Sequence, residues 1–146
     1  MCLRITSEDL LIQIAENDIT CYKVLSTWRE LNTGIETLQS PFFPGFEIWE
    51  IGKTTTVSPQ NNGPTQPFPT TIHGGFLHSF KFFEDAVKFT KDAGKTDFGK
   101  TLHIYKCAIP KGTFYYPGYH QIFVIGYASK SLKILEEVSK NKLTCA

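Results

Sequence analysis

A nearly continuous run of apolar residues in the last third of the chain constrains the fold most. The run is QIFVIGYA at residues 121–128, and it is rich in β-branched and aromatic side chains. A strand carries apolar side chains at nearly every position when both of its faces are covered. The run therefore predicts a central strand of a sheet that is buried on two sides.

Other segments rich in β-formers predict further strands. They are residues 19–25, 46–51, 102–109, 113–116 and 132–138. In the last of these the alternation of apolar and polar residues favours a strand over a helix. Pro117-Gly118 predicts a turn that ends the fourth.

Two helices are predicted beside these strands. The first spans residues 7–16, where acidic residues precede one apolar face. The second is FKFFEDAVKFTKDA at residues 80–93, capped by Ser79. We therefore predict a single α+β domain over residues 1–146, with a mostly antiparallel sheet that carries both helices on one face.

Two stretches are predicted to lie outside this framework. Residues 58–71, SPQNNGPTQPFPTT, form a proline-rich loop, which in a compact domain is either disordered or functional. Residues 139–146 form a frayed tail.

Charge and cysteine usage narrow the class of protein. Fifteen basic and fourteen acidic residues leave a formal charge of +1, which argues against general nucleic-acid binding. No apolar run approaches the ~20 residues that span a bilayer, so no membrane partner is expected. The four cysteines are far apart and no signal peptide precedes them, which predicts reduced thiols in the cytoplasm of a bacterial cell.

The segment HGGFLHSF at residues 73–80 is the first candidate site. Glycines beside a helix start let backbone N–H groups approach an anion, and imidazoles add donors. The candidate ligand-binding residues here are His73, Gly74, Gly75, His78 and Ser79. A turn with ordinary surface histidines is the alternative, and the histidine spacing predicts no metal site.

Tyrosines form the second candidate site. Tyr115, Tyr116 and Tyr119 flank the predicted turn, where they can stack on a base and donate hydrogen bonds. The same residues could equally close the core or form a subunit interface. Cys21 and Cys107 lie within predicted strands and are interpreted as small buried hydrophobes.

Three segments carry a resemblance. GFLHSFKFFEDAVKF, IYKCAIPKGTFYYPG and YASKSLKILEEV resemble conserved stretches in a family of small uncharacterised bacterial and phage proteins. This chain has Leu77 inserted within the family's GF-HSF segment. The resemblance implies a relationship to phage proteins and assigns no activity.

The layout is also similar to that of ADP-ribosyltransferases. The counterparts of their motifs would be Tyr22-Lys23, His78-Ser79, the Pro110–Gly112 turn, and Glu136 or Glu137 as the catalytic carboxylate. The first-strand Arg or His, the Ser-Thr-Ser motif and the ExE motif of that family are absent here. The similarity implies an enzyme that uses NAD.

Three functional hypotheses follow. The first is a non-catalytic protein that binds a small anionic ligand of the nucleotide type without a cofactor, and that sequesters a host signalling nucleotide as an anti-defence protein. The second is the NAD-dependent ADP-ribosyltransferase with Glu136 or Glu137. The third is a protein–protein interaction module, with a homo-oligomer as one form of it.

Overall fold

A computed structural model gives the fold for most of the chain. The described residues are 3–5, 13–29, 32–34, 36–39, 48–57, 70–72, 76–93, 102–121 and 124–138.

These residues form twelve strands and one helix. The strands before the helix are β1 (Leu3–Ile5), β2 (Gln13–Ile14), β3 (Ile19–Arg29), β4 (Glu36–Gln39), β5 (Ile48–Trp49), β6 (Thr54–Thr56), β7 (Thr70–Ile72) and β8 (Leu77–Phe80). The helix α1 (Phe83–Ala93) is followed by β9 (Leu102–Ile109), β10 (Phe114–Gln121), β11 (Val124–Ser129) and β12 (Ser131–Glu137).

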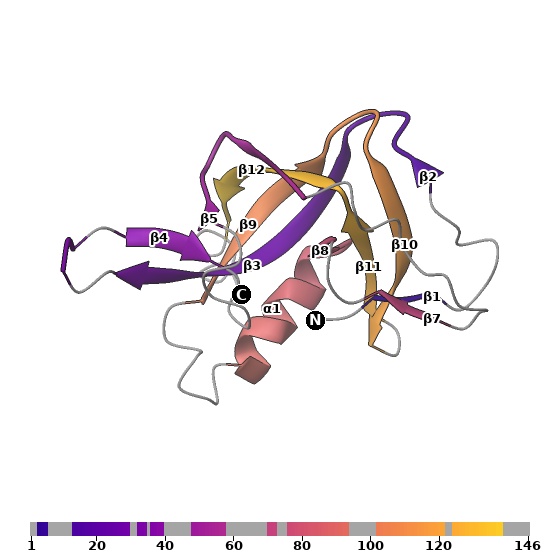
Figure 1. The fold of residues 1–146 in the computed structure, drawn as a ribbon. Coiled ribbons are helices and arrows are strands. Elements are labelled where there is room, and N and C mark those ends of the chain that lie inside the picture. The colour runs from indigo at the N-terminus through magenta and orange to yellow at the C-terminus, as the bar shows by residue number, and fades with distance from the viewer. Residues whose placement is uncertain are drawn as a thin grey trace.

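All of the strands belong to one strongly twisted sheet (Figure 1). Its central order is β12-β9-β3-β8-β11-β10, and each of these neighbours pairs antiparallel. The arm formed by the end of β3 with β4 and β5 projects from one side. Strand β11 pairs with β8, whereas β12, which follows it directly, pairs with β9, so the chain passes from one half of the sheet to the other at Lys130.

The two faces of the sheet carry separate apolar clusters. We call the face that carries α1 the outer face, where Phe80 contacts Phe89 of the helix and Tyr22 contacts Phe83. The opposite, inner face holds the larger cluster. Its fully buried members are Cys21, Leu25, Trp49, Leu77, Cys107, Ile109, Leu132 and Ile134.

The predicted two-helix architecture is wrong, although the mostly antiparallel sheet is confirmed. Residues 13–14, within the predicted first helix, form β2 and pair with β10. The next residue, Ala15, donates its N–H to Thr113 O at 2.9 Å and accepts from Gly112 N. Backbone groups that bind a distant segment in this way are unavailable to a helix. Residues 7–12 lie outside the described residues.

Two local predictions at the candidate sites are also wrong. Ser79 does not cap the helix, because it lies within β8 and α1 begins at Phe83. Pro117-Gly118 is not a turn, since β10 runs through both residues and pairs them with Tyr127 and Gly126. On the side of β10 away from β11, β2 pairs with Phe114 and Tyr115 and β1 with Tyr119, so Pro117 lies between these two pairings.

The remaining strand predictions agree with the structure within a few residues. The predicted central strand is β11, which lies between β8 and β10 and is buried from Gly126 to Ser129. The predicted strand at 132–138 is β12. The predicted loop at 58–71 ends in β7, whereas residues 58–69 and the tail at 139–146 lie outside the described residues.

Candidate functional site

A split in the sheet between β3 and β8 is the most distinctive feature of the described residues. One cross-strand pair, Tyr22 with Phe80, joins these two strands, whereas four such pairs join β8 to β11. Beyond the single pair, the Lys23 side chain takes the place of a backbone donor: its Nζ donates to the carbonyl oxygen of His78 at 2.6 Å. Lys23 is only 7% exposed, so a buried ammonium lies at the split.

The outer face beside this split carries what we call the histidine–aromatic cluster: Phe76, His78, Tyr116, His120 and Lys130. Directly paired residues of antiparallel strands project to the same side of a sheet. His78 and Tyr116 both pair with Ala128 of β11, one from each side, so a small residue separates them. The rings of His78 and His120 are 5.8 Å apart.

The His120 ring lies over a glycine. Its Nε2 is 2.6 Å from the carbonyl oxygen of Ser79, and because a carbonyl can only accept, Nε2 carries the proton. A side chain at Gly126 would overlap this ring. The absence of a Cβ at Gly126 therefore lets His120 reach from β10 across β11 to β8.

Lys130 brings a cation to the same cluster. Its Nζ lies 4.2 Å from the centre of the Phe76 ring, and that ring meets Tyr116 edge-on at 5.5 Å. Such a contact favours the charged amine, while burial lowers the pKa of Lys130. Burial also raises the pKa of Tyr116, so its hydroxyl stays protonated and can donate.

The inner face of the split holds a different set, which we call the inner polar group: Lys23, Trp49 and Ser79. Lys23 Nζ lies 5.1 Å from the centre of the Trp49 ring. Ser79 projects to this face because it alternates with His78 and Phe80 along β8. Its hydroxyl is close enough to the Cys21 thiol to lower the pKa of that thiol.

Cys21 and Cys107 face each other across β3 and β9 and are both fully buried. Burial raises the pKa of Cys21 to about 12 and that of Cys107 well above its ordinary value. A thiol needs its ionised form to act as a nucleophile. The packing role predicted for both cysteines is therefore confirmed.

The two predicted carboxylates lie on opposite sides of β12. Glu136 pairs with Lys106 and is exposed, whereas Glu137 pairs with Tyr105 and contacts His103, with Oε1 3.0 Å from Nδ1. Tyr105 in turn pairs with Lys23, so the inner face carries a row of Glu137, Tyr105 and Lys23 across three strands. Within the described residues, no three His, Cys, Asp or Glu side chains gather closely enough to hold a metal ion.

The structure divides each of the two predicted candidate sites between the faces of the sheet. His78 and Tyr116 lie together on the outer face, and Ser79 and Tyr115 project to the inner face. The Tyr115 hydroxyl donates to Gln13 Oε1 at 3.0 Å, and its ring packs against Tyr127. Tyr119 is exposed, and residues 73–75, the predicted His-Gly-Gly, lie outside the described residues.

Sequence reasoning missed His120, Lys130 and Trp49. A period of two links Tyr116, Gly118 and His120, which would have placed the histidine beside the tyrosine if β10 had been read as continuous. Lys130 and Trp49 carried no comparable signal, because their partners come from distant segments.

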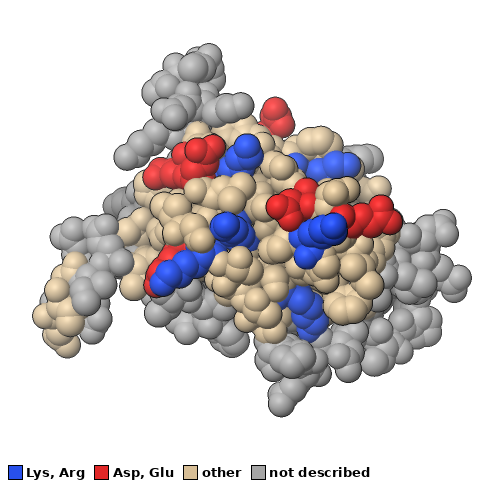
Figure 2. Space-filling model, turned by 90° about the horizontal axis from the view of Figure 1, so that it is seen from above, with Lys and Arg blue, Asp and Glu red and all other residues tan. Residues whose placement is uncertain are grey.

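The exposed charges on the face of Figure 2 do not form a patch of one sign. Basic and acidic side chains are interspersed across it. One exposed ion pair of the protein joins Lys53 Nζ to Glu50 Oε2 at 2.6 Å. Surface pairs of this kind contribute little to stability or binding.

No protein-family model, curated protein or solved structure matches this chain. The described residues contain no helix with the length and apolar character that crossing a bilayer requires.

Proposed function

We propose that this protein is a non-catalytic binding protein for a small anionic ligand of the nucleotide type. The observation that carries the proposal is the histidine–aromatic cluster, which gathers two imidazoles, an ammonium and a tyrosine hydroxyl on one face. Cations and N–H donors suit phosphate oxygens, and aromatic rings suit a base. The biological role that we propose is sequestration of a host signalling nucleotide.

Each group of the cluster has a distinct part in this proposal. The Lys130 ammonium and the His78 imidazole contact phosphate oxygens, while Phe76 and Tyr116 supply ring surfaces. His120 is a positioning residue, because its Nε2 proton is already engaged by the Ser79 carbonyl oxygen. Residues 73–75, which precede Phe76 and His78 in the sequence, stay a prediction as ligand-binding residues.

Isothermal titration with a panel of nucleotides, including NAD and cyclic dinucleotides, tests the proposal. Lys130→Met removes the charge and keeps the stem over Phe76, and we expect it to weaken binding about tenfold or more, as for the loss of a charge-assisted contact. Tyr116→Phe should weaken binding by a smaller factor. Lys111→Met, at an exposed turn, and Tyr115→Phe, on the inner face, are the matched controls.

Equal losses in the control variants, or no binding to any member of the panel, would contradict the proposal. Native mass spectrometry of the purified protein gives the co-purified ligand and the subunit count together. A stable oligomer that ignores nucleotides would favour the protein–protein interaction module instead.

One observation favours a second candidate, an ADP-ribosyltransferase-like enzyme that uses NAD. The row of Glu137, Tyr105 and Lys23 aligns the predicted carboxylate with the first-strand motif on one face. Incubation with labelled NAD and a host extract should then release nicotinamide, and Glu137→Gln should abolish the release. Glu136→Gln, which changes the neighbouring carboxylate on the other face, should leave it intact.

A further inference from the structure

Two buried polar groups on the inner face of the split have no hydrogen-bond partner in the described part of the chain. They are the Trp49 indole Nε1, in a side chain that is 1% exposed, and the Ser79 hydroxyl, in one that is fully buried. The Cys21 thiol beside Ser79 is a weak hydrogen-bonding group. Buried polar groups are nearly always paired, so an unpaired one indicates an occupant.

Both groups flank the same ammonium. Lys23 Nζ lies 5.1 Å from the centre of the Trp49 ring and donates to the carbonyl oxygen of His78, the residue before Ser79. An ammonium and an indole N–H are donors only, and a hydroxyl can donate as well. The indole N–H of Trp49 and the hydroxyl of Ser79 can both donate to one acceptor, and the positive charge of the nearby Lys23 favours a negative one.

We propose that the inner polar group (Lys23, Trp49 and Ser79) binds a small anion. The shared chemistry is a compact acceptor such as a halide ion or a carboxylate, held by the ammonium, the indole N–H and the serine hydroxyl. The group lies where backbone pairing between β3 and β8 is reduced to a single cross-strand pair and the Lys23 side chain reaches β8 instead.

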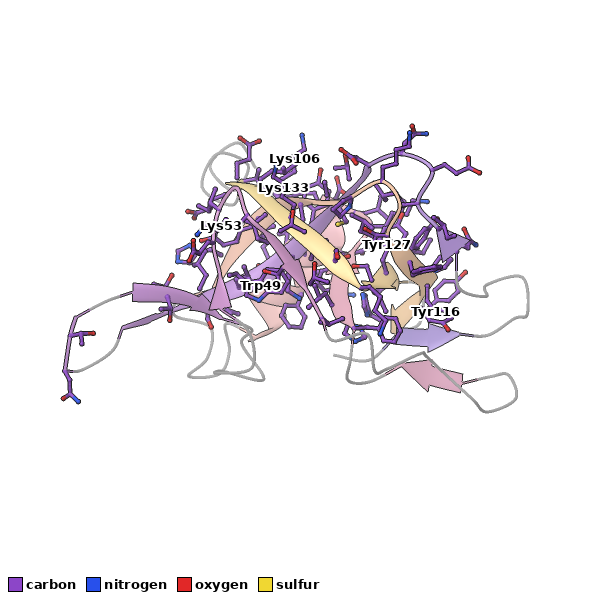
Figure 3. The ribbon with its side chains drawn as sticks, turned by 45° about the horizontal axis from the view of Figure 1, so that its top comes forward. Trp49, Lys53, Lys106, Tyr116, Tyr127 and Lys133 are labelled. Carbon is purple, nitrogen blue, oxygen red and sulfur yellow. The ribbon has the colours of Figure 1, made fainter. Side chains whose placement is uncertain are left out.

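This site is separate from the proposed nucleotide site. Ser79 and His78 project to opposite faces of β8, and Trp49 and Tyr116 lie well apart in Figure 3. The proposal rests on the unpaired groups of the inner face alone. A negative result in the test of one site therefore does not contradict the proposal for the other site.

Bromide quenching of tryptophan fluorescence tests this proposal directly. The chain has two tryptophans, so Trp28→Phe leaves Trp49 as the only emitter. Because Trp49 is buried, collisional quenching is weak, and a bound bromide should quench its emission along a saturable curve. Adding Lys23→Met, which is similar in volume and uncharged, should remove the saturation, whereas the exposed Lys88→Met should keep it.

Competition identifies the source of the anion. Chloride that restores the emission indicates a halide site, and acetate that restores it indicates a carboxylate site. Linear quenching of equal slope with and without Lys23→Met would overturn the proposal and leave a buried water as the occupant.

A second measurement uses the wild-type background and does not depend on Trp28→Phe. The urea midpoint of the wild-type protein should rise with bromide concentration relative to that of Ser79→Ala, because a ligand that binds the native state stabilises it. Ser79→Ala also removes an unpaired hydroxyl, so without anion its midpoint should be equal to or above that of the wild type. A difference between the two proteins that is independent of anion concentration would count against the site.

Discussion

The hydroxyl of Tyr105 lies on the inner face of β9 beside the carboxylate of Glu137. The residue is 4% exposed, and burial, followed by the negative charge of Glu137, raises its pKa from 10.0 to about 12. The native state therefore holds the Tyr105 proton more tightly than the unfolded state does. Between these two pKa values the native protein binds more protons, so its stability falls as the pH rises through this window.

Tyr105→Phe should remove this dependence. The shift corresponds to about 2–3 kcal/mol of stability, which is fully present below pH 10 and is lost as the pH approaches 12. We expect urea unfolding to give a flatter profile of free energy against pH for Tyr105→Phe above pH 10. Tyr119→Phe, at an exposed position of β10, should follow the wild type; parallel profiles for all three proteins would contradict the assignment.

At the scale of elements, β8, β11 and β10 act as one unit because His120 spans all three. The ring starts on β10, passes over Gly126 of β11 and donates to the Ser79 carbonyl oxygen of β8. A side-chain hydrogen bond thus adds to the ladder that already joins β11 to both neighbours. The unit carries His78 and Tyr116, so its geometry fixes their separation.

Gly126→Ala should disturb this unit. The added methyl group would overlap the His120 ring and lie 2.5 Å from the Ser79 carbonyl oxygen. We expect a loss of about 1–3 kcal/mol in the free energy of unfolding, measured in urea. Adding His120→Ala should recover part of that loss, and the two changes should be non-additive. A wild-type midpoint for Gly126→Ala alone would show that the ring does not occupy this space.

The elements best predicted from the sequence are those whose local pattern agrees with their environment. Strands β3 and β9 have dense β-formers, and α1 has acidic residues first and Lys91 in its last turn. The helix predicted over residues 13–14 was wrong because the same apolar pattern suits a helix and a short strand. The choice depends on pairing with β10, which lies a hundred residues further along the chain. Long-range pairing of that kind overrides local propensity.

Only part of the candidate site could be predicted from the sequence, because the side of the sheet that each residue faces depends on how far its strand continues. His78 and Tyr116, which were both predicted to bind ligand, lie on the same face of the sheet, but Ser79 and Tyr115 follow and precede them by one residue. Adjacent residues of a strand face opposite sides, so each predicted pair had to be divided once β8 and β10 were continuous. The turn expected at Pro117-Gly118 concealed this division.

At the scale of the whole molecule, Cys21 and Cys107 report on the middle of the sheet. Strands β3 and β9 pair along eight positions, and these two fully buried thiols lie opposite each other within that ladder. Local fraying at the edges does not reach them. Their exposure therefore requires opening of the central strands.

In a Cys2→Ser, Cys145→Ser background, the remaining two thiols should resist labelling by a disulfide reagent at pH 8. We expect native labelling to be at least about 1,000-fold slower than in denaturing urea, because it follows the small unfolded population. The raised pKa values of both thiols act in the same direction. Rapid labelling of the native protein would show that the centre of the sheet opens independently.

The long sequence separation between neighbouring segments has a consequence for how the protein is made. At Lys130, for example, the backbone donates to Phe114 O and accepts from Val57 N, so three distant segments meet there. During synthesis β3 emerges before its partner β9, which follows only after residues 30–101, roughly 4–14 seconds later at ordinary ribosome speeds. A strand destined for the middle of the sheet thus waits with an open edge for its longest pairing partner, at risk of aggregation and proteolysis.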